Sequence, residues 1–214
     1  VLPPGINPDR RAGNNAAAIR QAFRGEWQLQ ENDKLVLMIG SGFRTKGLDR
    51  AIYALSALSA DILARTQLMV IGQDTPDAFT QLAKKLGVKK NIRFLSGRDD
   101  VPNFLQGADV LIHPAYRENT GTVLLEAAVA GLPVLTTAVC GYSRYIREYD
   151  CGLVMNEPFD QHEMNDALAL MLQDNAQRAI WRSNALKMGE TADIYSLFER
   201  AADFIVTAVK SSRP

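Results

Sequence analysis

The 214-residue chain has few of the residues that build metal centres or staple small folds. Its two cysteines, Cys140 and Cys151, and its two histidines, His113 and His162, do not pair at metal-ligand spacing. We therefore expect no metal site, two reduced and partly buried thiols typical of a cytoplasmic protein, and a solvated helix position for His162. A chain of this length buries a core without disulfides, so a disulfide-stapled miniprotein is excluded.

An excess of charge and a long apolar run are also lacking. The 24 Lys and Arg residues balance 24 Asp and Glu residues, whereas a dedicated nucleic-acid binder is usually basic. No apolar run reaches the ~18–20 residues that span a bilayer, and the first residues lack the pattern of a signal peptide. The composition, 47% apolar and 22% charged, is typical of a folded soluble domain. We expect no nucleic-acid partner.

Short apolar runs alternate with helical patterns over most of the chain. Buried strands are predicted over residues 34–39, 68–71, 92–95, 110–113 and 133–136. Helices are predicted over 14–24, closed by Gly25, and over 48–58, 76–86, 100–107 and 121–130. After residues 152–155 the pattern changes to three successive helices, over 160–173, 175–188 and 193–209. This order predicts an α/β fold, a doubly wound (Rossmann-like) parallel sheet with helices on both faces and a helical C-terminal tail.

The two ends of the chain have patterns of their own. Residues 1–10 begin apolar and contain three prolines, which predicts the end of a strand leading into a crossover. We expect residues 1–12 to be an interdomain lead and residues 1–214 to be one domain of a longer protein. The last helix, within 193–214, has an apolar stripe and is expected either to cross the domain junction or to pack in the core. The stripe consists of Leu197, Ala201, Phe204, Ile205 and Ala208.

The segment from Glu118 onward follows a strand and opens a helix, at the sheet edge where ligands bind in such folds. Thr120 is expected to be the N-cap, and Gly121 lets the backbone approach a ligand, so the amides of residues 121–123 predict an anion site. Helical spacing places Glu126 ~6 Å below these amides, away from the buried stripe. There it can accept hydrogen bonds from a diol attached to the anion, as Glu118 can from above. A solvated charge is the alternative for either carboxylate alone.

A second segment, Gly40 to Gly47, places Arg44 and Lys46 after a strand that ends in glycine. Two cations there would face a bound diphosphate and neutralise its charge without a metal. The segment is no dinucleotide fingerprint, because position 45 is Thr rather than the third glycine, and no Walker loop, because no Lys-Ser/Thr pair follows the glycines. Taken alone, it is equally consistent with a tight turn that carries exposed bases.

A third segment, residues 96–100, combines a glycine and an arginine with two acids. Asp99 and Asp100 are expected to cap the following helix. Gly97 and Arg98 can approach the base or the phosphate of a ligand. Taken alone, this signal is weak.

Together these segments resemble the C-terminal, donor-binding half of the retaining two-domain (GT-B) glycosyltransferases that use nucleotide sugars. The resemblance covers nearly the whole chain. Its most specific part is the Glu-x7-Glu of Glu118 and Glu126, followed by Ala-x3-Gly-x-Pro over residues 127–133. Residues 113–116 and 135–142 are most similar to members that act on the lipopolysaccharide core. It also includes Lys46-Gly47, Gly97-Arg98, Ala108-Asp109-Val110, His113-Pro114 and Gly152-Leu-Val.

The resemblance implies one half of a GT-B fold and a function for the parent protein. That function is transfer of glucose from UDP-glucose to the lipopolysaccharide inner core, with retention at the anomeric carbon. It implies UDP or UDP-glucose, an N-terminal acceptor-binding domain and a lipopolysaccharide acceptor as partners, and no metal or cofactor. The parent would be cytoplasmic, peripheral on the inner membrane, and the isolated domain would bind donor weakly without turnover. A nucleotide-sugar epimerase half-domain and a non-catalytic nucleotide-binding domain remain open.

The resemblance also implies roles for individual residues. Glu118 would bind the hydroxyls of the donor sugar and Lys46 the diphosphate, and these two are the predicted catalytic residues. Glu126 would hold the ribose, Arg98 would border the base, and Arg10 would touch the nucleotide. The remaining donor-site residues would be Gly40, Ser41, Arg44, Asn119, Thr120, Gly121, Thr122 and Val123.

Two positions depart from the family pattern. The arginine that usually follows the strand glycine is Ser41 here, so the second cation is either Arg44 or missing. The glutamate that usually follows the loop at 137–141 is replaced by Ser143-Arg144-Tyr145.

Overall fold

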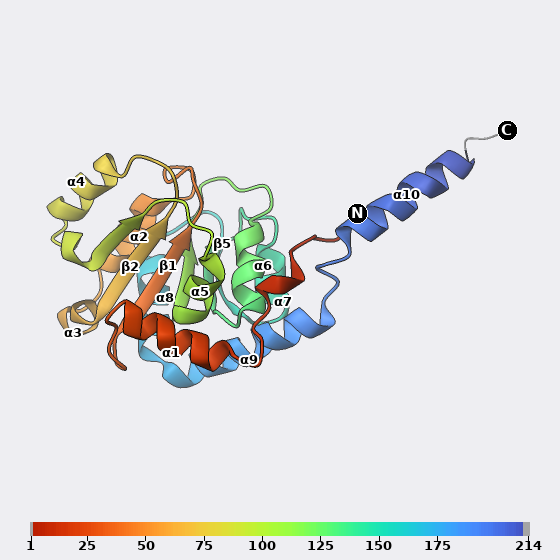
Figure 1. Cartoon of the computed structure of the whole chain (residues 1–214). Helices are drawn as coiled ribbons and strands as arrows, with labels where there is room; N and C mark the ends of the chain where they lie inside the picture. The colour runs from red at the N-terminus through yellow and green to blue at the C-terminus, as the bar shows by residue number, and fades with distance from the viewer. Residues whose placement is uncertain (1, 212–214) are drawn as a thin grey trace.

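A computed structural model describes the backbone of residues 2–211 and the side chains of residues 2–209. Within them, six parallel strands form one sheet in the order β3-β2-β1-β4-β5-β6 (Figure 1). The chain runs outward from β1 to β3 and then returns to the other side of β1, so the topological switch point lies between β1 and β4. The doubly wound parallel sheet is confirmed. The strands are β1 (Lys34–Ile39), β2 (Thr66–Ile71), β3 (Ile92–Leu95), β4 (Val110–His113), β5 (Val134–Thr137) and β6 (Gly152–Met155).

Helices cover both faces of the sheet because its central strands are apolar on both sides. In β1, Leu35 and Leu37 belong to one buried cluster, while Val36 and Met38 belong to the other. The first cluster is covered by α1 (Ala16–Glu26), α5 (Val101–Gly107), α6 (Thr122–Val129), α7 (Ser143–Glu148) and α9 (Asn175–Thr191). The second is covered by α2 (Leu48–Ser56), α3 (Ala60–Ala64), α4 (Asp77–Lys85) and α8 (Gln161–Gln173).

Several elements differ from the sequence prediction. The helix α1 continues through Gly25 to Glu26, because Phe23 packs against Phe104 with ring centroids 4.8 Å apart. Such packing outweighs the ~1 kcal/mol that a helical glycine costs. The helices α3 and α7 were not predicted, since each is too short to show a clear hydrophobic period. The strand β6 was not predicted either, because it is an edge strand of which only Gly152 is buried. Both cysteines are free and buried, and His162 is exposed on α8, as expected.

The last helix, α10 (Leu197–Ser211), projects from the body as a separate rod, with the N-terminal lead at its base (Figure 1). The amide of Ile6 donates to the carbonyl of Ile194 at 3.1 Å and joins the lead to the segment before α10. Phe204 and Ile205, from the predicted stripe, are 71% and 62% exposed. The prediction that this stripe packs in the core of the described chain is therefore wrong. None of the described helices is both long and apolar enough to cross a membrane.

Candidate functional site

A pocket of about 260 Å³ lies at the carboxyl ends of β1 and β4, at the switch point of the sheet. This is the edge where doubly wound sheets bind ligands. The pocket brings together residues from two segments that are distant in sequence, including both predicted catalytic residues. Its lining consists of Ile39, Gly40, Lys46, His113, Glu118, Thr120, Gly121, Thr122 and Val123.

The start of α6 supplies backbone donors to this pocket. The N-cap is Gly121, with φ +78° and ψ 50°, and the helix begins at Thr122, so the prediction that Thr120 is the N-cap is wrong. A left-handed N-cap favours glycine, which explains why the residue after Thr120 takes this position. Within the described residues, the amides at 121–123 donate to no protein acceptor. First-turn amides of this kind form anion sites.

Glu118 contacts two other side chains of the pocket. Its Oε2 accepts a hydrogen bond from the Lys46 ammonium, and the same oxygen lies 3.3 Å from Nε2 of His113. Its side chain is only 11% exposed. The hydrogen bond with His113 lowers the pKa of Glu118 most, burial raises it, and Lys46 lowers it again, to about 2. Glu118 is therefore ionised at neutral pH.

His113 is the residue of this site for which the sequence prediction gave no role. It ends β4, it is 1% exposed, and burial lowers its pKa. The neighbouring Cys140 thiol and Glu118 carboxylate outweigh that effect and raise the pKa overall. A polar residue at the carboxyl end of a buried apolar strand was the available signal.

The depressed pKa of Glu118 predicts a pH-dependent stability. A carboxyl whose pKa falls from 4.5 to about 2 on folding stabilises the protein above about pH 4.5, and this contribution is lost as the pH falls toward 2. We expect the difference in unfolding free energy between wild type and Glu118→Gln to shrink by about 2 kcal/mol between pH 7 and pH 3. Urea unfolding at both pH values measures it. An equal difference at the two pH values would contradict the prediction.

The loop that carries Glu118 is held by the segment after β5. Glu118 and Cys140 form a parallel β-bridge, and the amide of Tyr142 donates to the carbonyl of Thr120 at 2.8 Å. At Gly141 an added Cβ would lie 2.2 Å from the carbonyl oxygen of Asn119, so the two segments are in direct backbone contact. This support explains how an exposed loop presents a fixed carboxylate.

Glu126 lies one turn into α6 and contacts the N-terminal lead. Its Oε1 is 3.5 Å from Nε of Arg10, and its side chain is 22% exposed. Burial raises the pKa of Glu126, and the charge of Arg10 opposes that rise. The alternative of an ordinary solvated charge is therefore wrong. Two residues predicted to touch one nucleotide lie beside each other, although they are far apart in the sequence.

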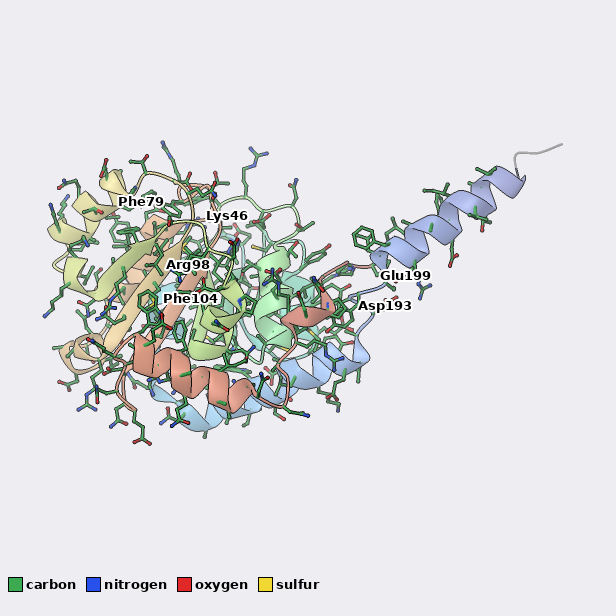
Figure 2. All side chains as sticks on the ribbon, in the orientation of Figure 1. Lys46, Phe79, Arg98, Phe104, Asp193 and Glu199 are labelled. Carbon is green, nitrogen blue, oxygen red and sulfur yellow. The ribbon has the colours of Figure 1, made fainter. Side chains whose placement is uncertain are left out.

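Arg98 does not line this pocket. Its guanidinium forms two hydrogen bonds with the carboxylate of Asp100, at 2.6 and 2.7 Å, and lies 4.9 Å from the centre of the Phe104 ring (Figure 2). Asp100 occupies the N-cap position of α5, but its side chain makes no capping hydrogen bond. The expectation that Asp100 caps the helix is wrong, because a charged arginine beside it is the stronger partner.

Ser41 and Arg44, which were also predicted to bind the donor, lie outside the pocket as well. The hydroxyl of Ser41 accepts a hydrogen bond from the amide of Gln73 at 3.1 Å. Arg44 is exposed and lines a neighbouring pocket together with Tyr116 and Arg117.

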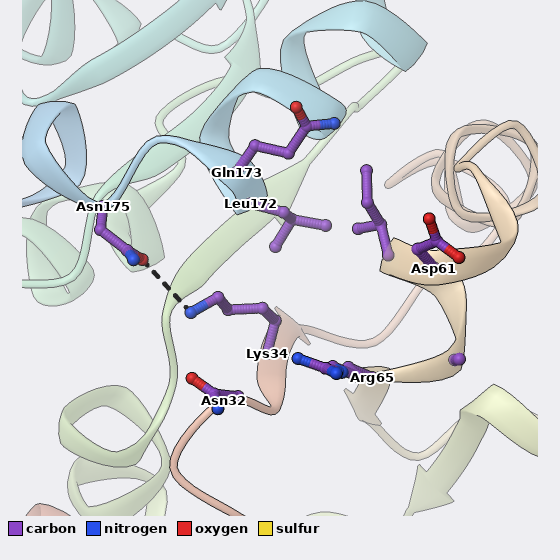
Figure 3. Close-up of a pocket in the computed structure, with 9 residues that line it drawn as sticks. Asn32, Lys34, Asp61, Arg65, Leu172, Gln173 and Asn175 are labelled. Carbon is purple, nitrogen blue, oxygen red and sulfur yellow. Dashed lines mark hydrogen bonds between the residues drawn. The ribbon is translucent and has the colours of Figure 1, made fainter.

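A larger pocket of about 570 Å³ lies at the opposite edge of the sheet, at the amino ends of β1 and β2 (Figure 3). Among the side chains that line it, Lys34 donates to Asn175 at 3.3 Å, and Asp61 lies apart from Lys34 on α3. The first residue of α9, Asn175, lines this pocket, but Asp61 is the single carboxylate among the described residues that line it. Chemistry rather than size therefore selects the smaller pocket.

The doubly wound sheet and the pocket at the start of α6 are those expected of a glycosyltransferase, and a family model confirms this class of protein. Residues 19–188 match the family described as glycosyl transferases group 1. The chain belongs to this family, as its motifs predicted.

Individual relatives narrow the comparison. The lipopolysaccharide glucosyltransferase WaaG of Escherichia coli K12 is 48% identical over 205 residues, which are 96% of this chain and 55% of that protein. A crystal structure of WaaG superposes with a TM-score of 0.92 and covers 95% of this chain and 55% of that one. A D-inositol 3-phosphate glycosyltransferase of Corynebacterium aurimucosum is 30% identical over 200 residues, 90% of this chain and 45% of that protein. The chain therefore spans about half the length of the curated relatives it matches.

More distant structures share the fold. HepE from Anabaena, solved in complex with UDP-glucose, has a TM-score of 0.80 at 19% identity and covers 95% of this chain and 56% of that one. At this identity the likeness concerns the fold alone. Together with the WaaG structure, it confirms that the architecture is one half of a GT-B fold.

Proposed function

We propose that the chain is the donor-binding half of a retaining glycosyltransferase that transfers glucose from UDP-glucose to the lipopolysaccharide core. The observation that carries this proposal is the start of α6, where free amides share a pocket with Glu118 and Lys46, and Glu126 follows one turn along the helix. The relative with 48% identity is named a lipopolysaccharide glucosyltransferase, and HepE binds UDP-glucose on the same fold.

Each part of the site has a task in this proposal. The amides of Gly121, Thr122 and Val123 and the ammonium of Lys46 stabilise the negative charge that grows on the leaving diphosphate. The proposal therefore requires no metal ion. Lys46 exchanges the carboxylate of Glu118 for the diphosphate, which leaves Glu118 free to accept hydrogen bonds from the sugar.

The outer residues position the rest of the donor. Glu126 accepts hydrogen bonds from the ribose hydroxyls, and Arg10 orients its carboxylate across the 3.5 Å contact. Arg98, fixed by Asp100, borders the base. Gly40 and Ser41 border the diphosphate, and Asn119 and Thr120 border the sugar.

The rest of the protein supplies the domain that binds the acceptor. The matched relatives are about twice as long as this chain. We propose an N-terminal acceptor-binding domain that packs on the lead and on the exposed apolar side of α10, where Phe198 is 75% exposed. The whole enzyme would act in the cytoplasm, at the surface of the inner membrane, and the isolated chain would not turn over donor.

Glu126 provides the test of this proposal. Glu126→Gln is expected to weaken binding of UDP to the chain about tenfold, because a charged acceptor for the ribose diol becomes a neutral one. Isothermal titration calorimetry measures the dissociation constant, and Glu163→Gln on the exposed side of α8 is the matched control. Absence of UDP binding to the wild type, or equal affinity in Glu126→Gln, would contradict the proposal. In the full-length protein, UDP release that requires acceptor separates a transferase from an epimerase.

A further inference from the structure

Arg44 and Arg117 line a second pocket, of about 420 Å³, together with Thr45, Asp49 and Tyr116. The same two loops build both pockets, since Thr45 precedes Lys46 and Arg117 precedes Glu118. The amide of Tyr116 donates to the carbonyl of Thr45 at 2.9 Å and joins the loops between them. The second pocket therefore lies directly beside the pocket that we propose for the donor.

The pocket has an excess of positive charge. Arg44 and Arg117 are exposed, and within the described part of the chain neither forms an ion pair or a side-chain hydrogen bond. Arg50 nearby has a structural role, because its guanidinium donates to two carbonyls and lies 3.6 Å from the centres of two aromatic rings. Asp49 is the carboxylate among the lining residues. Two guanidinium groups free to form paired hydrogen bonds favour a carboxylate or phosphate ligand.

Asp49 and Tyr116 add the features of a sugar site. The hydroxyl of Tyr116 donates to Oδ2 of Asp49 at 2.7 Å, while Oδ1 of Asp49 is buried and accepts no hydrogen bond from the described residues. A buried acceptor without a donor is unfavourable, and a ligand hydroxyl would satisfy it. The Tyr116 side chain is 46% exposed and offers apolar surface beside these polar groups.

We infer that this second pocket is an acceptor subsite for a negatively charged sugar. Arg44 and Arg117 bind the anionic group, and Asp49 binds a hydroxyl of the same sugar. This inference rests on the proposed function, because it places the acceptor next to Glu118 and the reacting end of the donor. It also moves Arg44 from the diphosphate, where the sequence placed it, to the acceptor.

Kinetics of the full-length protein test the inference. The variants are Arg44→Gln and Arg117→Gln, and the substrates are UDP-glucose and a de-O-acylated lipopolysaccharide that lacks the core glucose. We expect each variant to raise the KM for this acceptor about tenfold and to leave the KM for UDP-glucose within about twofold. Arg65→Gln, the same substitution at an exposed position on the opposite sheet edge, is expected to change neither value.

Two further experiments identify the molecule that carries the anionic group. Esterifying the anionic groups of the acceptor should raise the KM of the wild type for the acceptor to the value found in the variants. It should not change the acceptor KM of the variants. Binding of wild type and variants to vesicles of phosphatidylglycerol, with phosphatidylcholine vesicles as reference, tests a lipid surface instead. Loss of vesicle binding with an unchanged acceptor KM would overturn the inference.

The remaining outcomes are equally decisive. An unchanged acceptor KM in both variants, or weaker UDP binding by Arg44→Gln in calorimetry, would overturn the inference. If the wild-type chain does not bind UDP at all, the proposed function fails. Intact UDP binding with an unchanged acceptor KM rejects only the acceptor subsite. Thermal unfolding of the variants, expected to match wild type, excludes misfolding as the cause of a raised KM.

Discussion

Replacing Glu118 by Gln is expected to lower the rate of sugar transfer by the full-length protein by about 10²–10³-fold. The substitution keeps the size of the side chain and removes the charge that Lys46 and His113 both contact. In the proposed reaction this charge faces the sugar, whose reacting carbon becomes more positive as the diphosphate leaves. An interaction that strengthens in the transition state changes kcat more than KM.

Transfer of radiolabelled glucose to lipopolysaccharide measures this effect, and calorimetry with UDP measures binding separately. Because Glu118 is assigned to the sugar, UDP affinity should change less than threefold, which distinguishes it from Glu126. Glu148→Gln, at an exposed position on α7, is the control and should retain full activity. Transfer within about twofold of wild type in Glu118→Gln would remove this residue from the reaction.

The second large effect is expected for Gly47→Ala. Gly47 has a φ of +77° at the N-cap of α2, and an added Cβ would lie 2.1 Å from the carbonyl oxygen of Pro114. The left-handed conformation alone costs about 1 kcal/mol with alanine, and displacement of a backbone carbonyl adds to it. We expect the free energy of unfolding to fall by about 3–5 kcal/mol. UDP affinity should fall as well, because Gly47 follows Lys46.

Gly87→Ala separates the two contributions. Gly87 has nearly the same conformation, with φ +75°, but no atom lies within 4 Å of an added Cβ. This variant should lose only about 1 kcal/mol. Urea unfolding of both variants gives the comparison, and equal losses would show that Pro114 exerts no steric effect.

Much of the fold follows from local sequence. Three of the five predicted strands have the predicted bounds, since an apolar run that is buried on both faces ends where polar or glycine residues begin. The helices α3 and α7 were missed because five and six residues show no clear period, and β6 was missed because it is an edge strand of which only Gly152 is buried. The stop at Gly25 was wrong because packing on α5 outweighed the propensity of one residue.

The candidate site was partly predictable for a topological reason. The carboxyl ends of parallel strands share one edge, so Lys46 after β1 and Glu118 after β4 had to lie at the same edge of the sheet once the strands were recognised. The strand order then made them neighbours at the switch point. Their direct contact, and the support from residues 140–142, were not predictable, because the conformation of loops depends on what packs against them.

By itself the sequence determined the alternation of strands and helices, the sheet edge that carries the site, and the identity of its main charged groups. Only the tertiary structure decided which groups meet. It paired Arg10 with Glu126, placed buried His113 against Glu118, and separated Arg44 from Lys46. The physical reason is that hydrophobic periodicity is a local property of the chain. The contact between Arg10 and Glu126 joins segments that meet only after the sheet has formed, and the directions of the His113 and Arg44 side chains depend on what packs around their loops.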